Sequence, residues 1–107
     1  MWRTAELASA FLIAAGPGAL AQQASDALAG ASLARQVCAV CHALPNESRS
    51  PRADAPTFPV IARTPGLTAL ALTVALQSSH RNIPDLVLSQ QEINDVSAFI
   101  LSLRSAN

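Results

Sequence analysis

The 107-residue chain contains no lysine and no tyrosine, and aromatic residues make up only 4% of it. All of its basic residues are arginines, and acidic residues balance them to a net charge of zero. A neutral chain without a basic stripe is not expected to bind nucleic acid or to dock electrostatically on an anionic membrane. The length predicts one domain, and the scarcity of aromatic side chains leaves that domain little material for a core.

The first 21 residues have the pattern of a secretory signal. Arg3 supplies a short basic region, residues 7–15 are an apolar run, and Ala19-Leu20-Ala21 is the small-x-small pattern that signal peptidase recognises. A membrane anchor is the alternative, but the run is about half of the roughly 20 residues that cross a bilayer. The sequence therefore predicts a signal peptide at residues 1–21, an exported domain at residues 22–107, and no membrane span after cleavage.

Helix patterns cover three segments of this domain. Good helix formers from Asp26 to Gln36 follow a cap at Ser25 or Asp26. Thr64-Pro65 has the pattern of an N-cap followed by proline, and predicts a helix to about Ser78. That helix is apolar almost all round, so it is expected to be buried on more than one side. A capping box at Ser89–Glu92 begins the last helix.

Long loops separate the predicted helices. Prolines are dense between Pro45 and Pro59, which excludes a helix or a central strand there, and residues 79–88 form a second loop. No segment alternates as a strand does. The sequence predicts an all-α fold of three main helices, whose loops need a cofactor or similar group to pack against.

The only two cysteines are three residues apart, in Cys38-Ala39-Val40-Cys41-His42. This is the attachment pattern of haem c: the two thiols reach the two vinyl groups of one porphyrin, and the adjacent histidine becomes the proximal iron ligand. A disulfide between these cysteines would close a tiny loop and constrain little of the unfolded chain.

Three other interpretations of the cysteines remain open. A thioredoxin-like redox pair uses the same spacing, but it follows a strand in a βαβ unit. A zinc site could combine Cys38, Cys41, His42 and His80, although His42 is too close to Cys41 to join it comfortably. A bare structural disulfide is the third.

Residues 26–104 resemble a small monohaem class I cytochrome c of the bacterial periplasm. The resemblance is carried by the Cys38–His42 motif, by Pro56-Thr57-Phe58, and by the segment from His80 to Ser89. It implies the class I cytochrome c fold, with three main helices and long loops wrapped around one haem c attached through Cys38 and Cys41. It also implies a periplasmic location.

The resemblance also implies roles for single residues. The Pro56 carbonyl would accept the Nδ1 hydrogen of His42, and Phe58 would pack on the porphyrin. Gly30 would let the first and last helices cross closely, facing Phe99.

The sequence departs from the family at the sixth iron ligand. The usual methionine before the proline of the second loop is replaced by Ile83, and the only methionine, Met1, leaves with the signal. The sixth position could be open or hold water, could be taken by His80, or could be taken by another group such as Asn82. If the position is open, the apolar Ile83 over the iron would keep the pocket dry.

The predicted function is one-electron transfer between a dehydrogenase-type donor and a respiratory acceptor, by a protein that is not an enzyme. Its partners would be redox proteins, with the chain acting as a monomer or as a subunit of a dehydrogenase complex. The alternative is a five-coordinate haem c protein that binds or senses small ligands such as CO or NO. Peroxidase-like chemistry is weaker, because no distal acid–base pair is visible. Loss of the thioether ligand predicts a lowered reduction potential.

Overall fold

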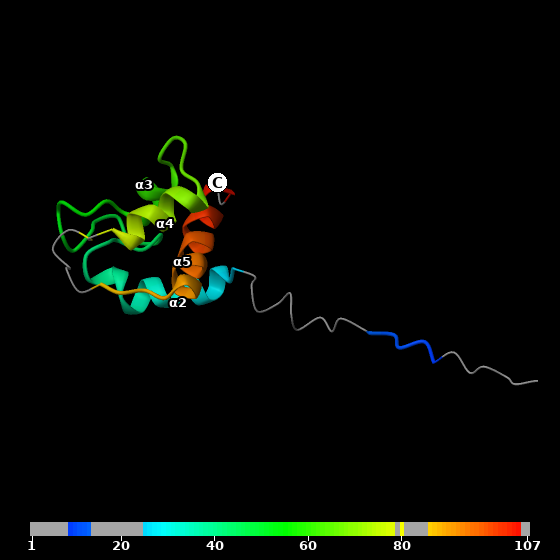
Figure 1. Ribbon diagram of the computed structural model, residues 1–107. Helices are drawn as coiled ribbons and strands as arrows, with labels where there is room; N and C mark the ends of the chain where they lie inside the picture. The colour runs from blue at the N-terminus through cyan, green and yellow to red at the C-terminus, as the bar shows by residue number, and fades with distance from the viewer. Residues whose placement is uncertain (1–8, 14–24, 79, 81–85, 106–107) are drawn as a thin grey trace, which may run out of the picture.

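The computed structural model describes residues 9–13, 25–78, 80 and 86–105. Residues 9–13 are an exposed, extended segment away from the helices, and the others form helices and loops around a small core (Figure 1). The elements are α2 (Ala27–Gln36), the 3₁₀ turn η1 (Cys38–Val40), α3 (Phe58–Ala62), α4 (Ala69–Gln77), α5 (Gln90–Ser102) and the 3₁₀ turn η2 (Leu103–Ser105). Within these residues no helix is long and apolar enough to cross a membrane. The described part has no strand beyond one bridge residue, His80, so the predicted all-α class is confirmed.

Helix α2 crosses α5 at close range (Figure 1). The Asp26 carboxylate caps α2 by accepting the N–H groups of Leu28 and Ala29, as predicted. Gly30 is buried at the crossing, and a Cβ atom there would collide with the backbone carbonyl of Asp95. The expected close approach is therefore present.

The residue opposite Gly30 differs from the prediction. Gly30 faces the backbone of Asp95 and Val96, one helical turn before Phe99. The Phe99 ring instead packs against Phe58, with ring centroids 5.6 Å apart. Spacing along a helix predicts which side of it faces a partner, but the turn at which two helices touch depends on how both are packed.

Helix α3 was not expected, because Phe58 and Pro59 lay at the end of the predicted proline-rich loop. Thr57 caps it by accepting the N–H of Val60. Pro59 lies in the first turn, where the missing N–H costs no helical hydrogen bond. The phenyl ring of Phe58 is thereby directed into the core, where it is almost fully buried.

Helix α4 begins later than predicted and is less buried. Its N-cap is Thr68, not Thr64, because Thr64–Leu67 forms a turn that leads to α4. On the helix only Leu72 is buried, at 5% exposure, whereas Leu70 and Val74 are 73% and 56% exposed. The helix is therefore less enclosed than predicted: α4 packs on α5 and lines an apolar cavity, but Leu70 and Val74 face solvent.

The last helix matches its predicted pattern. Ser89 and Glu92 form the capping box, with the Glu92 carboxylate 2.7 Å from the Ser89 nitrogen. Ile93, Val96 and Ile100 are buried on one face. The core that results joins Val96 and Ile100 to small and apolar side chains of the other helices, namely Ala34, Phe58, Ala62 and Leu72.

Candidate functional site

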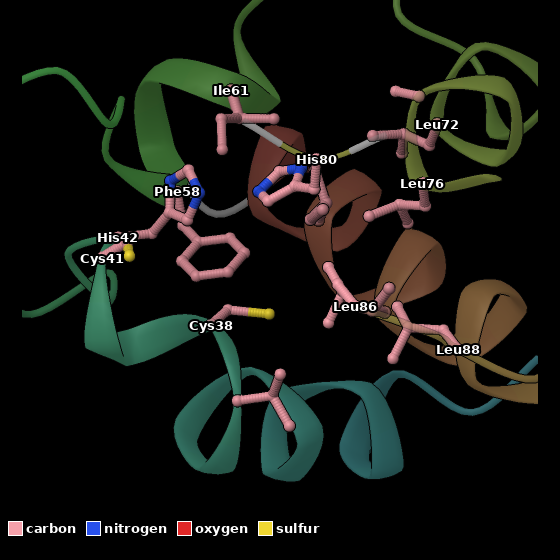
Figure 2. A pocket seen from close by; sticks show the side chains of 14 residues that line it. Cys38, Cys41, His42, Phe58, Ile61, Leu72, Leu76, His80, Leu86 and Leu88 are labelled. Atoms are coloured by element: carbon pink, nitrogen blue, oxygen red, sulfur yellow. The ribbon is translucent and has the colours of Figure 1, made fainter. Parts of the chain in front are cut away.

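An apolar cavity lies between η1, α3, α4 and α5 (Figure 2). The space free of protein atoms between its walls is about 730 Å³, a figure that includes open solvent at its mouth. Its polar and sulfur-bearing wall residues are Cys38, Cys41, His42 and His80, and the rest are apolar. The apolar wall consists of Val37, Phe58, Ile61, Leu72, Ala75, Leu76, Leu86, Leu88, Val96 and Ile100.

The two cysteines lie at one end of this cavity, in and after η1. The N–H groups of Cys41 and His42 both donate to the Cys38 carbonyl, at 3.0 and 2.9 Å, which tightens the chain into one turn. Both thiols are half-buried and neither is in a disulfide. Burial, and then the neighbouring Cys41, raise the pKa of the Cys38 thiol, so it stays protonated at neutral pH.

His42 is held by a hydrogen bond of 2.6 Å between Nδ1 and the Pro56 carbonyl. A carbonyl can only accept, so Nδ1 carries the proton and Nε2 is left with a lone pair for a metal. The ring centroid lies 5.8 Å from that of Phe58. The structure thus brings His42, Pro56 and Phe58 together, with the hydrogen bond to Pro56 that the family resemblance implies.

Hydrogen bonds hold the backbone of Ala43, the residue after His42, at both its N–H and its carbonyl. Ala43 is fully buried, its N–H donates to the Ser50 hydroxyl, and its carbonyl accepts the Phe58 N–H. Sequence reasoning missed Ala43 and Ser50 because neither residue type signals a site. These contacts join the two segments that supply His42 and Pro56.

His80 lies on the opposite wall and faces His42 (Figure 2). The two imidazole centroids are 5.9 Å apart and the rings are tilted by 44°. Ile83 and Asn82, the other residues predicted for this side, lie outside the described residues. Leu72, Leu76, Leu86 and Leu88 were also not singled out, because an apolar residue carries no mark of the cofactor that it contacts.

The residues present fit haem c and disfavour the other interpretations. An apolar cavity, two free thiols at one end and an imidazole with a free Nε2 are what a covalently attached haem requires. Among the described residues no three His, Cys, Asp or Glu side chains are grouped to hold a metal ion by themselves. That grouping is what a zinc site would need, and a βαβ unit, which a thioredoxin-like pair would need, does not occur in the described segments.

A curated protein, cytochrome c-552 of Bradyrhizobium diazoefficiens, is 40% identical to the chain over 81 residues. The match covers 76% of this chain and 78% of the relative. No family model and no solved structure matches the chain. At this identity and coverage the chain belongs to the c-type cytochromes: it has the all-α class I fold, binds haem c covalently through Cys38 and Cys41, and is an electron carrier.

Proposed function

We propose that this cytochrome is exported to the periplasm, where it takes single electrons from a dehydrogenase-type donor and passes them to a respiratory acceptor. It acts as a monomer or as a subunit of a dehydrogenase complex, and it turns over no substrate of its own. When bound, the haem supplies an iron that accepts and releases one electron. The protein supplies its attachment, its orientation and a dry pocket.

The observation that carries this proposal is the exposure of the attachment edge. Val40, between the two cysteines, is 71% exposed, and Cys38, Ala39 and Cys41 are each partly exposed. A partner protein can therefore approach the edge to which the haem is bound without any movement of the helices. Electron transfer weakens steeply with distance, so an accessible edge suits a carrier.

The other side chains of the site have supporting roles in the proposal. Cys38 and Cys41 form the thioether bonds, and His42 binds the iron through Nε2. The Pro56 carbonyl holds the His42 ring in one orientation and makes its imidazole a more basic ligand for the iron. Phe58 packs beside His42 and keeps water from it. Ile83 extends the apolar wall in the sequence-based hypothesis.

The test is a potentiometric titration of the mature, haem-loaded protein, in which the visible spectrum is recorded at each potential. A carrier gives a reversible one-electron curve, with the same spectra on reduction and reoxidation. Irreversible change, or oxidation that consumes peroxide catalytically, would contradict the proposal. Export is tested by sequencing the N-terminus of protein recovered from a periplasmic extract, which should begin at Gln22.

A further inference from the structure

We infer that His80 is the sixth ligand of the iron, so that two histidines bind it from opposite sides. This inference rests on the proposed function only in that both require a bound haem. Resemblance to the family gives no support for it, since the family position for this ligand is Ile83. The placement of His80 in the structure is what supports it.

The separation of the two rings is the first argument. A metal bonded to one nitrogen of each of two imidazoles, at about 2 Å each, holds the ring centroids about 6 Å apart. The centroids of His42 and His80 are 5.9 Å apart. In Figure 2 one nitrogen of each ring lies on the side that faces the other ring. Neither ring has to move far for both to bind one iron.

The surroundings of His80 are the second argument. His80 lines the cavity together with apolar side chains such as Ile61 and Leu76 (Figure 2). Within the described part of the chain no side-chain hydrogen bond ties this ring to another group. The ring is half-buried, and with no hydrogen-bond partner in the described part of the chain it has a ring nitrogen free for a group in the cavity to bind. A metal at the centre of the cavity would be such a group.

The composition of the chain is the third argument. The chain has two histidines, and its one methionine is Met1. Nδ1 of His42 already donates a hydrogen bond to the Pro56 carbonyl, so only its Nε2 is free for a metal. Of the residue types that bind haem iron strongly, His80 is the one that the structure places opposite His42.

Two strong nitrogen ligands have a consequence for function. With both axial positions filled, the iron is low-spin and does not take up CO, which favours the carrier over the ligand-binding alternative. An imidazole in place of a thioether also favours the ferric state, so the reduction potential is lower than with methionine ligation.

The direct experiment counts the histidine nitrogens on the iron. Because the chain contains two histidines, growth on ¹⁵N-histidine labels no other imidazole. Electron–nuclear double resonance of the ferric, haem-loaded protein should show two histidine nitrogens coupled to low-spin iron. A single coupled histidine, or a high-spin ferric iron, would overturn the inference.

The variant His80→Ala gives an independent result. It should convert the iron to high spin, allow CO to bind the reduced form, and return to low spin when free imidazole is added. Ser78→Ala, an exposed neighbour in the same segment, is the matched control and should stay low-spin. A His80→Ala protein that remains low-spin, or conversion by Asn82→Ala instead, would overturn the inference.

The inference and the proposed function can fail separately. One histidine on an iron that exchanges electrons reversibly would support the proposed carrier function and contradict the inference that His80 binds the iron. Two histidines on an iron that shows no reversible electron exchange would support His80 as the ligand and contradict the proposed function as an electron carrier.

Discussion

The two walls of the cavity are built in different ways. The wall that carries His42 is made by α2, η1, α3 and α5, and it is held by close backbone packing at Gly30 and by hydrogen bonds around Ala43. The wall that carries His80 is made by α4 and, among the residues described after it, by Leu86 and Leu88. There only Leu72 is buried on α4, while Leu70 and Val74 face solvent.

This difference separates the part of the site that the fold requires from the part that can vary. Moving His42 would disturb the adjacent buried Ala43 and its hydrogen bonds to Ser50 and Phe58, so the position of His42 is coupled to the packing of this wall. Among the described residues the wall of His80 has few buried side chains, so we expect a change of ligand there to cost little stability. The hypothesis that Ile83 stands where the family has methionine is therefore compatible with a class I fold.

The largest effect is expected for Gly30→Ala, on the first wall. The added Cβ would collide with the Asp95 carbonyl, so α2 and α5 must separate. We expect a loss of about 3 kcal/mol or more in the free energy of unfolding, at the upper end of overpacking effects. The measurement is guanidinium unfolding of the haem-loaded protein followed by circular dichroism. Stability equal to wild type would mean that the crossing is not rigid.

A pair of substitutions on α4 compares buried and exposed positions of the second wall. Leu72→Ala should cost roughly 2–3 kcal/mol through the cavity that it leaves. Leu70→Ala, two residues earlier and 73% exposed, should change stability by no more than about 0.5 kcal/mol. The same unfolding measurement applies. Equal losses for both would show that α4 buries both faces, contrary to the structure.

Arg104 connects the end of α5 with the turn that leads to α4, and so joins the two walls. Its guanidinium donates to the carbonyls of Ala62, Thr64 and Leu67. Because the side chain is partly in solvent, Arg104→Ala should cost roughly 1–2 kcal/mol. Arg49→Ala, at an exposed loop position, serves as the control and should cost less than about 0.5 kcal/mol. If the control costs as much, the loss reflects net charge and not the three hydrogen bonds.

The smallest effect, and one of opposite sign, is expected for Ser97→Ala on α5. Ser97 is buried, and its hydroxyl has no hydrogen-bond partner among the described residues. Replacing an unpaired hydroxyl with hydrogen should leave stability unchanged or raise it by up to about 1 kcal/mol. A clear loss of stability would show that the hydroxyl is hydrogen-bonded in solution.

Local patterns in the sequence were sufficient for the elements whose cause is local. The cap at Asp26 and the capping box at Ser89 and Glu92 depend on residues within one turn of each other, and both are present. The predicted start of α4 was wrong. Thr64 and Thr68 offer similar capping groups, and Pro65 favoured Thr64 as the N-cap, whereas the structure has Thr68 there. Short-range chemistry could not choose between them.

The sequence by itself determined the chemistry of the site: the cysteine spacing and adjacent histidine define haem c attachment, and the composition excludes methionine as a ligand in a chain without its signal. Only the tertiary structure decided which residues meet across the cavity. It placed the imidazole centroids of His80 and His42 5.9 Å apart, set Gly30 against the backbone of Asp95, and left one face of α4 exposed. These contacts join residues far apart in the chain, and their geometry follows from how the helices pack and not from the spacing of residue types.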